Sequence, residues 1–152
     1  MPIQGVDNVK KMLAKNKREA NKKVRGVFLA GLGPIIEATP ADSGAHRNNW
    51  FLTTGVPSGL YGRSESKSAS GSHASLATMP SWVLNRKLYF TNNGPAITTL
   101  EYGGYPSPVE KGSYIKKSKS YEILSVNGYS KQAPTGWVRK AVILMRNKIR
   151  SL

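Results

Sequence analysis

The apolar pattern over the first quarter of the chain constrains the fold more than any other feature of the sequence. The pattern predicts a helix over residues 7–39, on the order of 40 Å long, with Asp7 as its N-cap. Large apolar side chains are few in its first half, so we expect that half to project from the core. The apolar residues recur mostly three or four positions apart, at Val6, Val9, Leu13, Ala20, Val24, Phe28, Leu32 and Ile35.

Helix-breaking residues mark the far end of this predicted helix. Gly31, Gly33 and Pro34 should bend or interrupt it. Thr39 should end it, because the residue before a proline is pushed out of the helical region and Pro40 follows.

Two segments rich in aromatic and β-branched residues, 50–56 and 87–91, predict strands. Between them, residues 57–82 are dominated by Ser and Gly. Such a stretch buries too little apolar area to offset its ordering entropy, so it predicts a flexible loop. Two roles stay open for this loop, a contact with a partner and a plain insertion.

The second half of the chain predicts shorter elements. Residues 96–102 form a short helix that ends at Gly103. Segments 121–126 and 129–131 flank Asn-Gly, which is the strongest short signal for a β-hairpin.

An amphipathic helix is predicted over residues 137–150, with its apolar residues on one face. The natural way to bury these faces is an α+β fold, in which a small antiparallel sheet is packed on one side by the two terminal helices. The length of 152 residues suits a single domain over 1–152.

Composition limits the classes of partner and chemistry. The formal charge of +15 favours polyanionic partners such as nucleic acid. The absence of cysteine excludes disulfides, cysteine-based zinc sites and thiol nucleophiles. No apolar run approaches the ~20 residues needed to cross a bilayer, and the first residues lack the pattern of a signal peptide. We therefore expect a protein made in the cytoplasm, without a membrane partner.

Catalytic and metal-binding patterns are thin. Asp42, Ser43 and His46 have the residue types of a hydrolase triad, but they lie too close in sequence to form one. Capping or turn roles for Asp42 and Ser43 are the favoured reading. The acidic residues are scattered singly, and two histidines make no zinc motif. We therefore predict no enzyme activity, no catalytic residue, no metal and no cofactor.

Three segments carry recognisable turn and cap patterns: residues 38–50 after the predicted long helix, residues 88–103 with Glu101-Tyr102-Gly103 at their end, and residues 132–138 at the entry to the last helix. Together they resemble the tail-completion proteins of tailed bacteriophages, the minor tail protein Z-like group. The first is similar to the family's turn after the long helix, the second to its strand–short helix–Glu-aromatic-Gly segment, and the third to its Gln-Ala-Pro entry to the last helix. Ala45, where the family usually has Leu, the unusual His46 and a longer Ser-rich loop depart from the pattern. The positions that carry the resemblance are Thr39, Pro40, Asp42, Ser43, Gly44, Arg47, Trp50, Glu101, Tyr102, Gly103, Ala133, Pro134, Gly136 and Trp137.

These positions also make physical sense without the family. Pro40 stops a helix, Gly44 permits a positive φ, and Trp50 anchors a strand. Glu101 has three open interpretations: an ion pair with Arg47, a contact with a neighbouring subunit, or a solvated surface position.

The resemblance implies a structural virion protein of the phage neck. Such a protein forms a ring with its own copies, joins the portal or head-closure proteins to the tail terminator or tail tube, and lets double-stranded DNA pass through. Contacts to DNA would be non-specific. Candidate contacts to DNA or to partners are Lys10, Lys11, Lys15, Arg18, Lys22, Lys116, Lys117 and Lys119.

Two alternatives belong to other classes of function. A basic protein that binds nucleic acid non-specifically outside the virion would be a monomer with salt-sensitive DNA affinity. A hydrolase that uses His46 would lose its activity in a His46→Ala variant.

Overall fold

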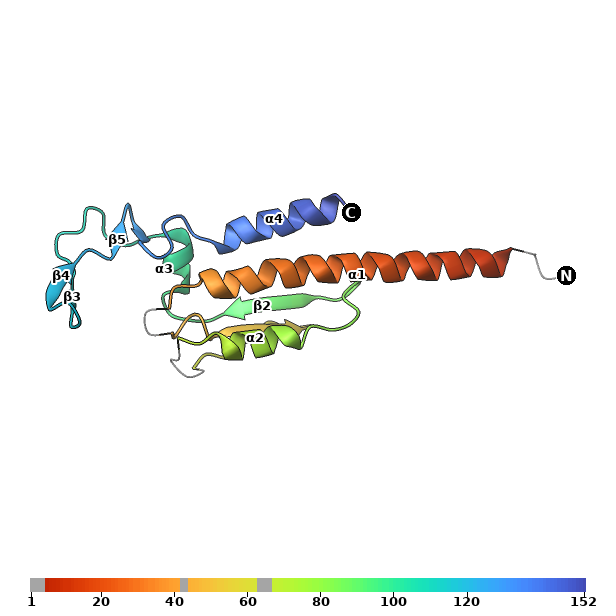
Figure 1. The fold of residues 1–152 in the computed structure, drawn as a ribbon, viewed down its shortest axis with the longest axis horizontal. Coiled ribbons are helices and arrows are strands. Elements are labelled where there is room, and N and C mark those ends of the chain that lie inside the picture. Colours follow the sequence, from red (N-terminus) through yellow and green to blue (C-terminus); the bar gives the residue numbers. More distant parts are fainter. Residues whose placement is uncertain (1–4, 42–43, 63–66) are drawn as a thin grey trace.

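The structure, a computed structural model, describes residues 5–41, 44–62 and 67–152 and has an elongated α+β fold (Figure 1). Its elements in chain order are α1 (Val6–Ala38), β1 (Trp50–Thr54), α2 (Ser70–Ala77), β2 (Leu88–Asn92), α3 (Ile97–Tyr102), β3 (Ser113–Ile115), β4 (Ser120–Glu122), β5 (Ser125–Val126), β6 (Tyr129–Ser130) and α4 (Val138–Arg150). The predicted fold class, with a long N-terminal helix, a C-terminal helix and small antiparallel sheets, is confirmed.

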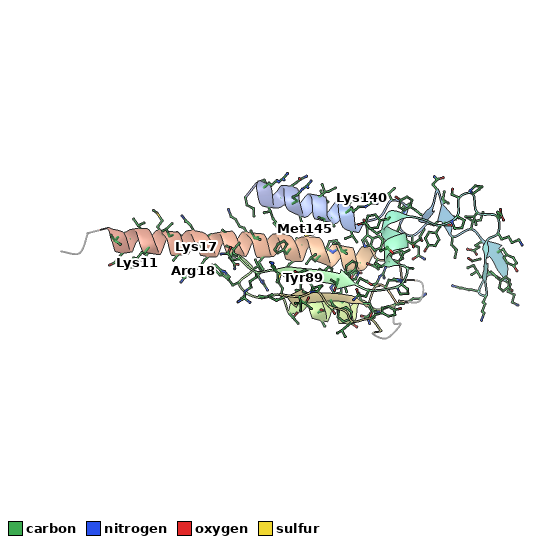
Figure 2. All side chains as sticks on the ribbon, turned by 180° about the vertical axis from the view of Figure 1, so that it is seen from behind. Lys11, Lys17, Arg18, Tyr89, Lys140 and Met145 are labelled. Atoms are coloured by element: carbon green, nitrogen blue, oxygen red, sulfur yellow. The ribbon has the colours of Figure 1, made fainter. Side chains whose placement is uncertain are left out.

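Helix α1 lies between two sets of elements. Helix α4 packs along one side of its C-terminal half, and the β1–β2 sheet lies on another side (Figure 1). The sequence predicted both terminal helices on one side of the sheet, but α4 packs on α1. The side chain of Met145 lies between the two helices, where a Cβ on Gly31 would come 2.2 Å from it (Figure 2). The absence of a side chain at Gly31 therefore makes room for Met145 of α4.

The N-terminal part of α1 extends beyond the body of the molecule (Figure 1). Every residue from 5 to 20 is exposed, whereas Asn21, Ile35 and Ile36 are buried. The expected N-cap is wrong, because Gly5 caps the helix with a φ of 107° and Asp7 lies inside the first turn. The helix also continues through Pro34 to Ala38.

Within the described residues, three two-stranded antiparallel sheets replace the single predicted sheet. Strands β1 and β2 pair with Leu52 opposite Phe90. The predicted strand 121–126 is divided between two hairpins, β3–β4 and β5–β6, and the former was not predicted. Asn127 and Gly128 both have positive φ in the β5–β6 turn, as the Asn-Gly signal requires.

The prediction of a loop over 57–82 is wrong for its second part. Residues 70–77 form α2, and Ser72, Ser75 and Leu76 are buried. The prediction failed because a low apolar content limits hydrophobic burial but does not prevent serine hydroxyls from making buried hydrogen bonds. Leu76, with Met79 and Val83 just beyond α2, belongs to the main core cluster.

The core lies between the C-terminal half of α1, the β1–β2 sheet and the α2 region. Trp50 stacks on Phe90, with ring centroids 4.8 Å apart and an interplanar angle of 12°. This cluster is made of Ile35, Ile36, Trp50, Leu52, Leu76, Met79 and Val83.

Candidate assembly site

The carboxylate of Glu101 joins α3 to the start of α4. It accepts hydrogen bonds from the backbone N–H groups of Trp137 (2.8 Å), Val138 (2.9 Å) and Arg139 (2.9 Å). The guanidinium of Arg139 donates to the same carboxylate at 3.0 Å and to the backbone carbonyl of Glu101 at 3.0 Å. Glu101 therefore caps α4 from outside that helix.

The charge of Glu101 suits this place in the fold. The first turn of α4 contains no acidic residue, and Arg139 and Lys140 put positive charge near the positive end of the helix dipole. Burial alone would raise the pKa of the Glu101 carboxyl, but the three backbone N–H groups and the Arg139 guanidinium lower it below its ordinary value. The carboxylate is thus held in its charged form.

Two predicted glycines make room for this junction. Gly136 has a φ of 72°, and a Cβ there would come 2.4 Å from the carbonyl oxygen of Glu101. Gly103 ends α3 with a φ of 80°, as predicted, and a Cβ there would come 3.0 Å from the carbonyl oxygen of Gly128. Both positions therefore require glycine for backbone conformation and for space.

The other residues of these two segments have separate roles. Tyr102 is exposed, and the Arg139 guanidinium lies 4.7 Å from its ring centroid. Ala133 is buried and its N–H donates to the carbonyl of Ser130, whereas Pro134 is exposed. The segment from Gln132 to Trp137 is thus a turn that is anchored by the buried Ala133 and leads into α4.

The turn after α1 is held to that helix by side chains. Thr39 Oγ1 donates to the carbonyl of Ile35 at 2.7 Å and accepts from Trp50 Nε1 at 2.9 Å. Arg47 donates to the carbonyls of Glu37 (2.9 Å) and Thr39 (3.0 Å), which lie at the C-terminal end of the helix. These contacts occupy carbonyl groups that a helix end leaves without helical partners.

The remaining residues of this turn agree in part with the predictions. Gly44 has the expected positive φ, 84°. Pro40 follows the last helical turn and is partly buried. The predicted turn roles of Asp42 and Ser43 lie outside the described residues.

The three predicted segments meet at the end of α1. The carbonyl of Ile35 accepts from Thr39 and also from the indole Nε1 of Trp137 at 3.0 Å. Trp137 is in turn held by Glu101 through its backbone N–H. The first and third segments are thus joined at Ile35, and the second and third at Glu101.

Two interpretations of Glu101 are wrong. Arg47 binds carbonyls at the end of α1, and the cation beside Glu101 is Arg139. A solvated surface position is also wrong, because Glu101 is only 6% exposed. The basic first turn of α4 was the signal in the sequence that an acidic cap from elsewhere was needed.

Sequence reasoning missed the polar residues that join α2 to the body. Ser72 Oγ accepts from the N–H of Trp50 and Ser75 Oγ from that of Leu52, both at 2.9 Å. The side chain of Asn48 accepts from the N–H of Gly71, in the first turn of α2, at 2.8 Å. The sequence offers no pattern for these contacts, because they connect residues more than twenty positions apart.

The two histidines have structural surroundings. The ring of His46 lies against Gly94, and burial lowers the pKa of His46. His73 pairs with the carboxylate of Glu37, between α2 and α1. In the described part of the chain, no group of three His, Asp or Glu side chains is placed to hold a metal ion.

The predicted basic contacts are exposed and lie in two separate parts of the molecule. Lys10, Lys11, Lys15 and Arg18 are on the projecting part of α1, and Lys22 lies where this helix enters the body beside Asn21. Figure 2 shows Lys11 and Arg18 standing off the helix. The other three are Lys116, Lys117 and Lys119, in the turn of the β3–β4 hairpin at the opposite end of the molecule (Figure 1). The structure therefore does not bring the two basic groups together.

Comparison of the chain with protein-family models, with curated proteins and with solved structures finds no match. Over residues 5–41, 44–62 and 67–152, no helix has both the length and the apolar content for a membrane crossing.

Proposed function

We propose that this chain is a structural protein of a tailed-phage neck. It forms a ring around the DNA passage and joins the head-side connector to the tail, as a tail-completion protein. It contacts its own copies, the neighbouring neck proteins and, without sequence specificity, double-stranded DNA. The proposal places it in the virion after synthesis in the host cytoplasm, without enzyme activity.

The large accessible surface is the observation that carries this proposal. The chain exposes 10380 Å², whereas a compact monomer of 16.6 kDa exposes about 7,600 Å². The excess of about 2,800 Å² exceeds the ~800 Å² per partner of a standard protein interface and is enough for two neighbours. A ring subunit needs two such surfaces.

Exposed apolar side chains are present on the projecting part of α1, on α4 and on the β3–β4 hairpin, and they support the proposal. The projecting part of α1 exposes Val9 and Leu13, each more than half exposed. Leu144 on α4 is 69% exposed and borders an apolar groove of about 500 Å³ between α1 and α4. At the other end, Tyr121 of the β3–β4 hairpin is 74% exposed. Exposed large apolar side chains beside an apolar groove are typical of surfaces that become covered on assembly.

The resemblance supports the same proposal. The segments that resemble tail-completion proteins form the joints at the end of α1 and at the start of α4. They therefore fix how α1 and α4 are presented to neighbours.

Antibody labelling of purified virions tests the location. We expect label at the head–tail junction in negative-stain images. Label only on the capsid shell or at the tail tip, or virions that lack this chain, would overturn the proposal. The last outcome, together with a monomer that binds DNA, would favour the protein that acts outside the virion.

A paired substitution tests the role of the apolar surface. Val9→Gln with Leu13→Gln should prevent ring formation, measured by analytical ultracentrifugation of the chain with its neck partners. Asn8→Gln with Glu19→Gln is the control, since both residues are exposed on the same helix but away from the face of Val9 and Leu13, and it should assemble normally. Normal assembly of the Val9/Leu13 variant would exclude this surface as a subunit contact.

A further inference from the structure

Basic residues form one straight row along α1. Lys11, Lys15, Arg18 and Lys22 are spaced four, three and four positions apart, which places them on one face of the helix. We call these four residues the cation row. It is about 16 Å long, and all four side chains are exposed.

Arg25, which continues the line of the cation row along α1, contacts oxygen atoms of the body. Arg25 follows Lys22 by three positions and lies where α1 enters the body. Its guanidinium donates to the backbone carbonyls of Pro80 (2.9 Å) and Met79 (3.4 Å). The chain itself thus supplies oxygen acceptors to this face at Arg25, where the body reaches it.

The cation row has no such acceptors within the described residues. No carboxylate there forms an ion pair with any of its members, although Asp7 and Glu19 lie on the same part of α1. Like charges three and four positions apart destabilise a helix by a few tenths of a kcal/mol per pair. An external anion that binds the cation row would remove this repulsion and stabilise the helix.

We propose that the cation row binds the phosphate backbone of double-stranded DNA. Duplex DNA offers about one negative charge per 1.7 Å of its axis, so a straight row about 16 Å long can meet a phosphate with each of its cations. No other helix or strand of the described residues flanks residues 6–20 of α1, so a duplex can lie along this part (Figure 1). The choice of DNA among polyanions rests on the proposed function.

A membrane surface fits this helix less well. The face opposite the cation row has Val9 and Leu13 but is interrupted by Asn16, and residues 5–20 contain no aromatic side chain. Helices that lie in a bilayer surface carry large apolar and aromatic residues on that face. Duplex DNA is therefore the ligand that the charge pattern favours.

Fluorescence anisotropy with a DNA duplex about two helical turns long tests the proposal on the purified full chain. The affinity is measured between about 50 and 200 mM KCl, where each phosphate contact adds about 0.9 to the slope of log affinity against log salt. Replacing all four members of the cation row by Gln should make this slope shallower by about 3.6.

A control variant removes the same charge from another helix. Lys140, Arg146, Lys148 and Arg150 on α4 are scattered around that helix and form no row. Their replacement by Gln should change the slope by less than about 1. Equal losses in both variants would show an effect of net charge alone and would overturn the proposal.

A hairpin variant and a vesicle-binding measurement test for other binding sites and other ligands. If replacement of Lys116, Lys117 and Lys119 by Gln removes most of the slope, the β3–β4 hairpin is the DNA site and the proposal is wrong. Binding of the wild type to vesicles of phosphatidylserine and phosphatidylcholine that depends on the cation row, with no binding to the duplex, also overturns it.

These results are distinguishable from those that test the proposed function. Loss of the salt slope in the cation-row variant, with virions that lack this chain, would retain the DNA site and reject the neck. An unchanged slope, with label at the head–tail junction, would retain the neck and reject this site. Circular dichroism checks that the variants keep the helix content of the wild type.

Discussion

The two halves of α1 have the same kinds of surface, but among the described residues only the C-terminal half is covered by other elements of the chain. In residues 21–38, α4 covers the apolar face and the carbonyls of Met79 and Pro80 bind Arg25. In residues 6–20, the apolar face is exposed, and so are three of the four members of the cation row, Lys11, Lys15 and Arg18. One continuous helix therefore builds the fold with its C-terminal half and presents an exposed surface with its N-terminal half.

The largest effect on stability should come from the packed half. Ile36 is fully buried, at 0% exposure, in the core cluster. Ile36→Ala should lower the free energy of unfolding by about 3–4 kcal/mol, because it leaves a cavity. Urea denaturation measures this. A loss below about 1 kcal/mol would mean that α1 is not anchored here.

A substitution at the junction that positions α4 should have the second largest effect on the free energy of unfolding. Glu101→Gln keeps the shape of the side chain but removes its charge, and should cost about 2–3 kcal/mol. Glu122→Gln is the matched control, since Glu122 is exposed and its carboxylate accepts from Ser118 on a surface hairpin. Equal losses in the two variants, measured by urea denaturation, would exclude a special role for the α4 cap.

Acid should weaken the same junction in the wild type. The pKa of Glu101 is lower in the folded chain than its ordinary value of 4.5, so the folded state binds fewer protons. The stabilisation is therefore complete above pH 4.5 and is lost as the pH falls through the folded pKa. The unfolding free energy, measured from pH 7 downward, should fall more steeply in wild type than in Glu101→Gln. Parallel curves would contradict this.

The contacts of α2 should have a smaller effect. Ser72 Oγ accepts from Trp50 N–H and donates to the carbonyl of Arg47 at 2.8 Å. Ser72→Ala removes both hydrogen bonds in a buried place and should cost about 2 kcal/mol. Ser70→Ala, at an exposed position of the same helix, should stay within about 0.5 kcal/mol. The free energy of unfolding of both variants is measured by thermal or urea denaturation. A larger loss in Ser70→Ala than in Ser72→Ala would refute this prediction.

The smallest effect is expected in the projecting half. Leu13 is 54% exposed, so Leu13→Ala should change the unfolding free energy of the monomer by no more than about 0.5 kcal/mol. A loss above about 1 kcal/mol under monomeric conditions would show that the projecting half folds back onto the body, and the contrast within α1 would disappear.

Local patterns in the sequence predicted the elements that depend on local chemistry. The length of α1, the stop at Gly103 and the Asn127-Gly128 turn follow from periodicity and from backbone conformations that glycine and asparagine adopt. The candidate junction residues were predicted from their resemblance to a family, but their contacts were not.

Contacts between residues that are far apart in the sequence determine the features of the fold that local patterns did not predict. Glu101 caps a helix that begins 37 positions later, as its hydrogen bond to Val138 shows, and the hydroxyls of Ser72 and Ser75 meet β1 more than twenty positions earlier. A Ser-rich composition looks the same whether the hydroxyls face water or a strand. The position of α4 on α1 likewise depends on Gly31 meeting Met145, which periodicity alone does not reveal.

The serine contacts also limit how copies of the chain can join. An unprotected strand edge is a template on which another chain can add a strand and start an aggregate. On β1, the N–H groups of Trp50 and Leu52 that point away from β2 are already engaged by α2. Sheet extension at this edge would require α2 to detach first. Crowding of many copies, as in the proposed ring, is therefore compatible with a short, two-stranded sheet, because its β1 edge is covered by α2 of the same chain.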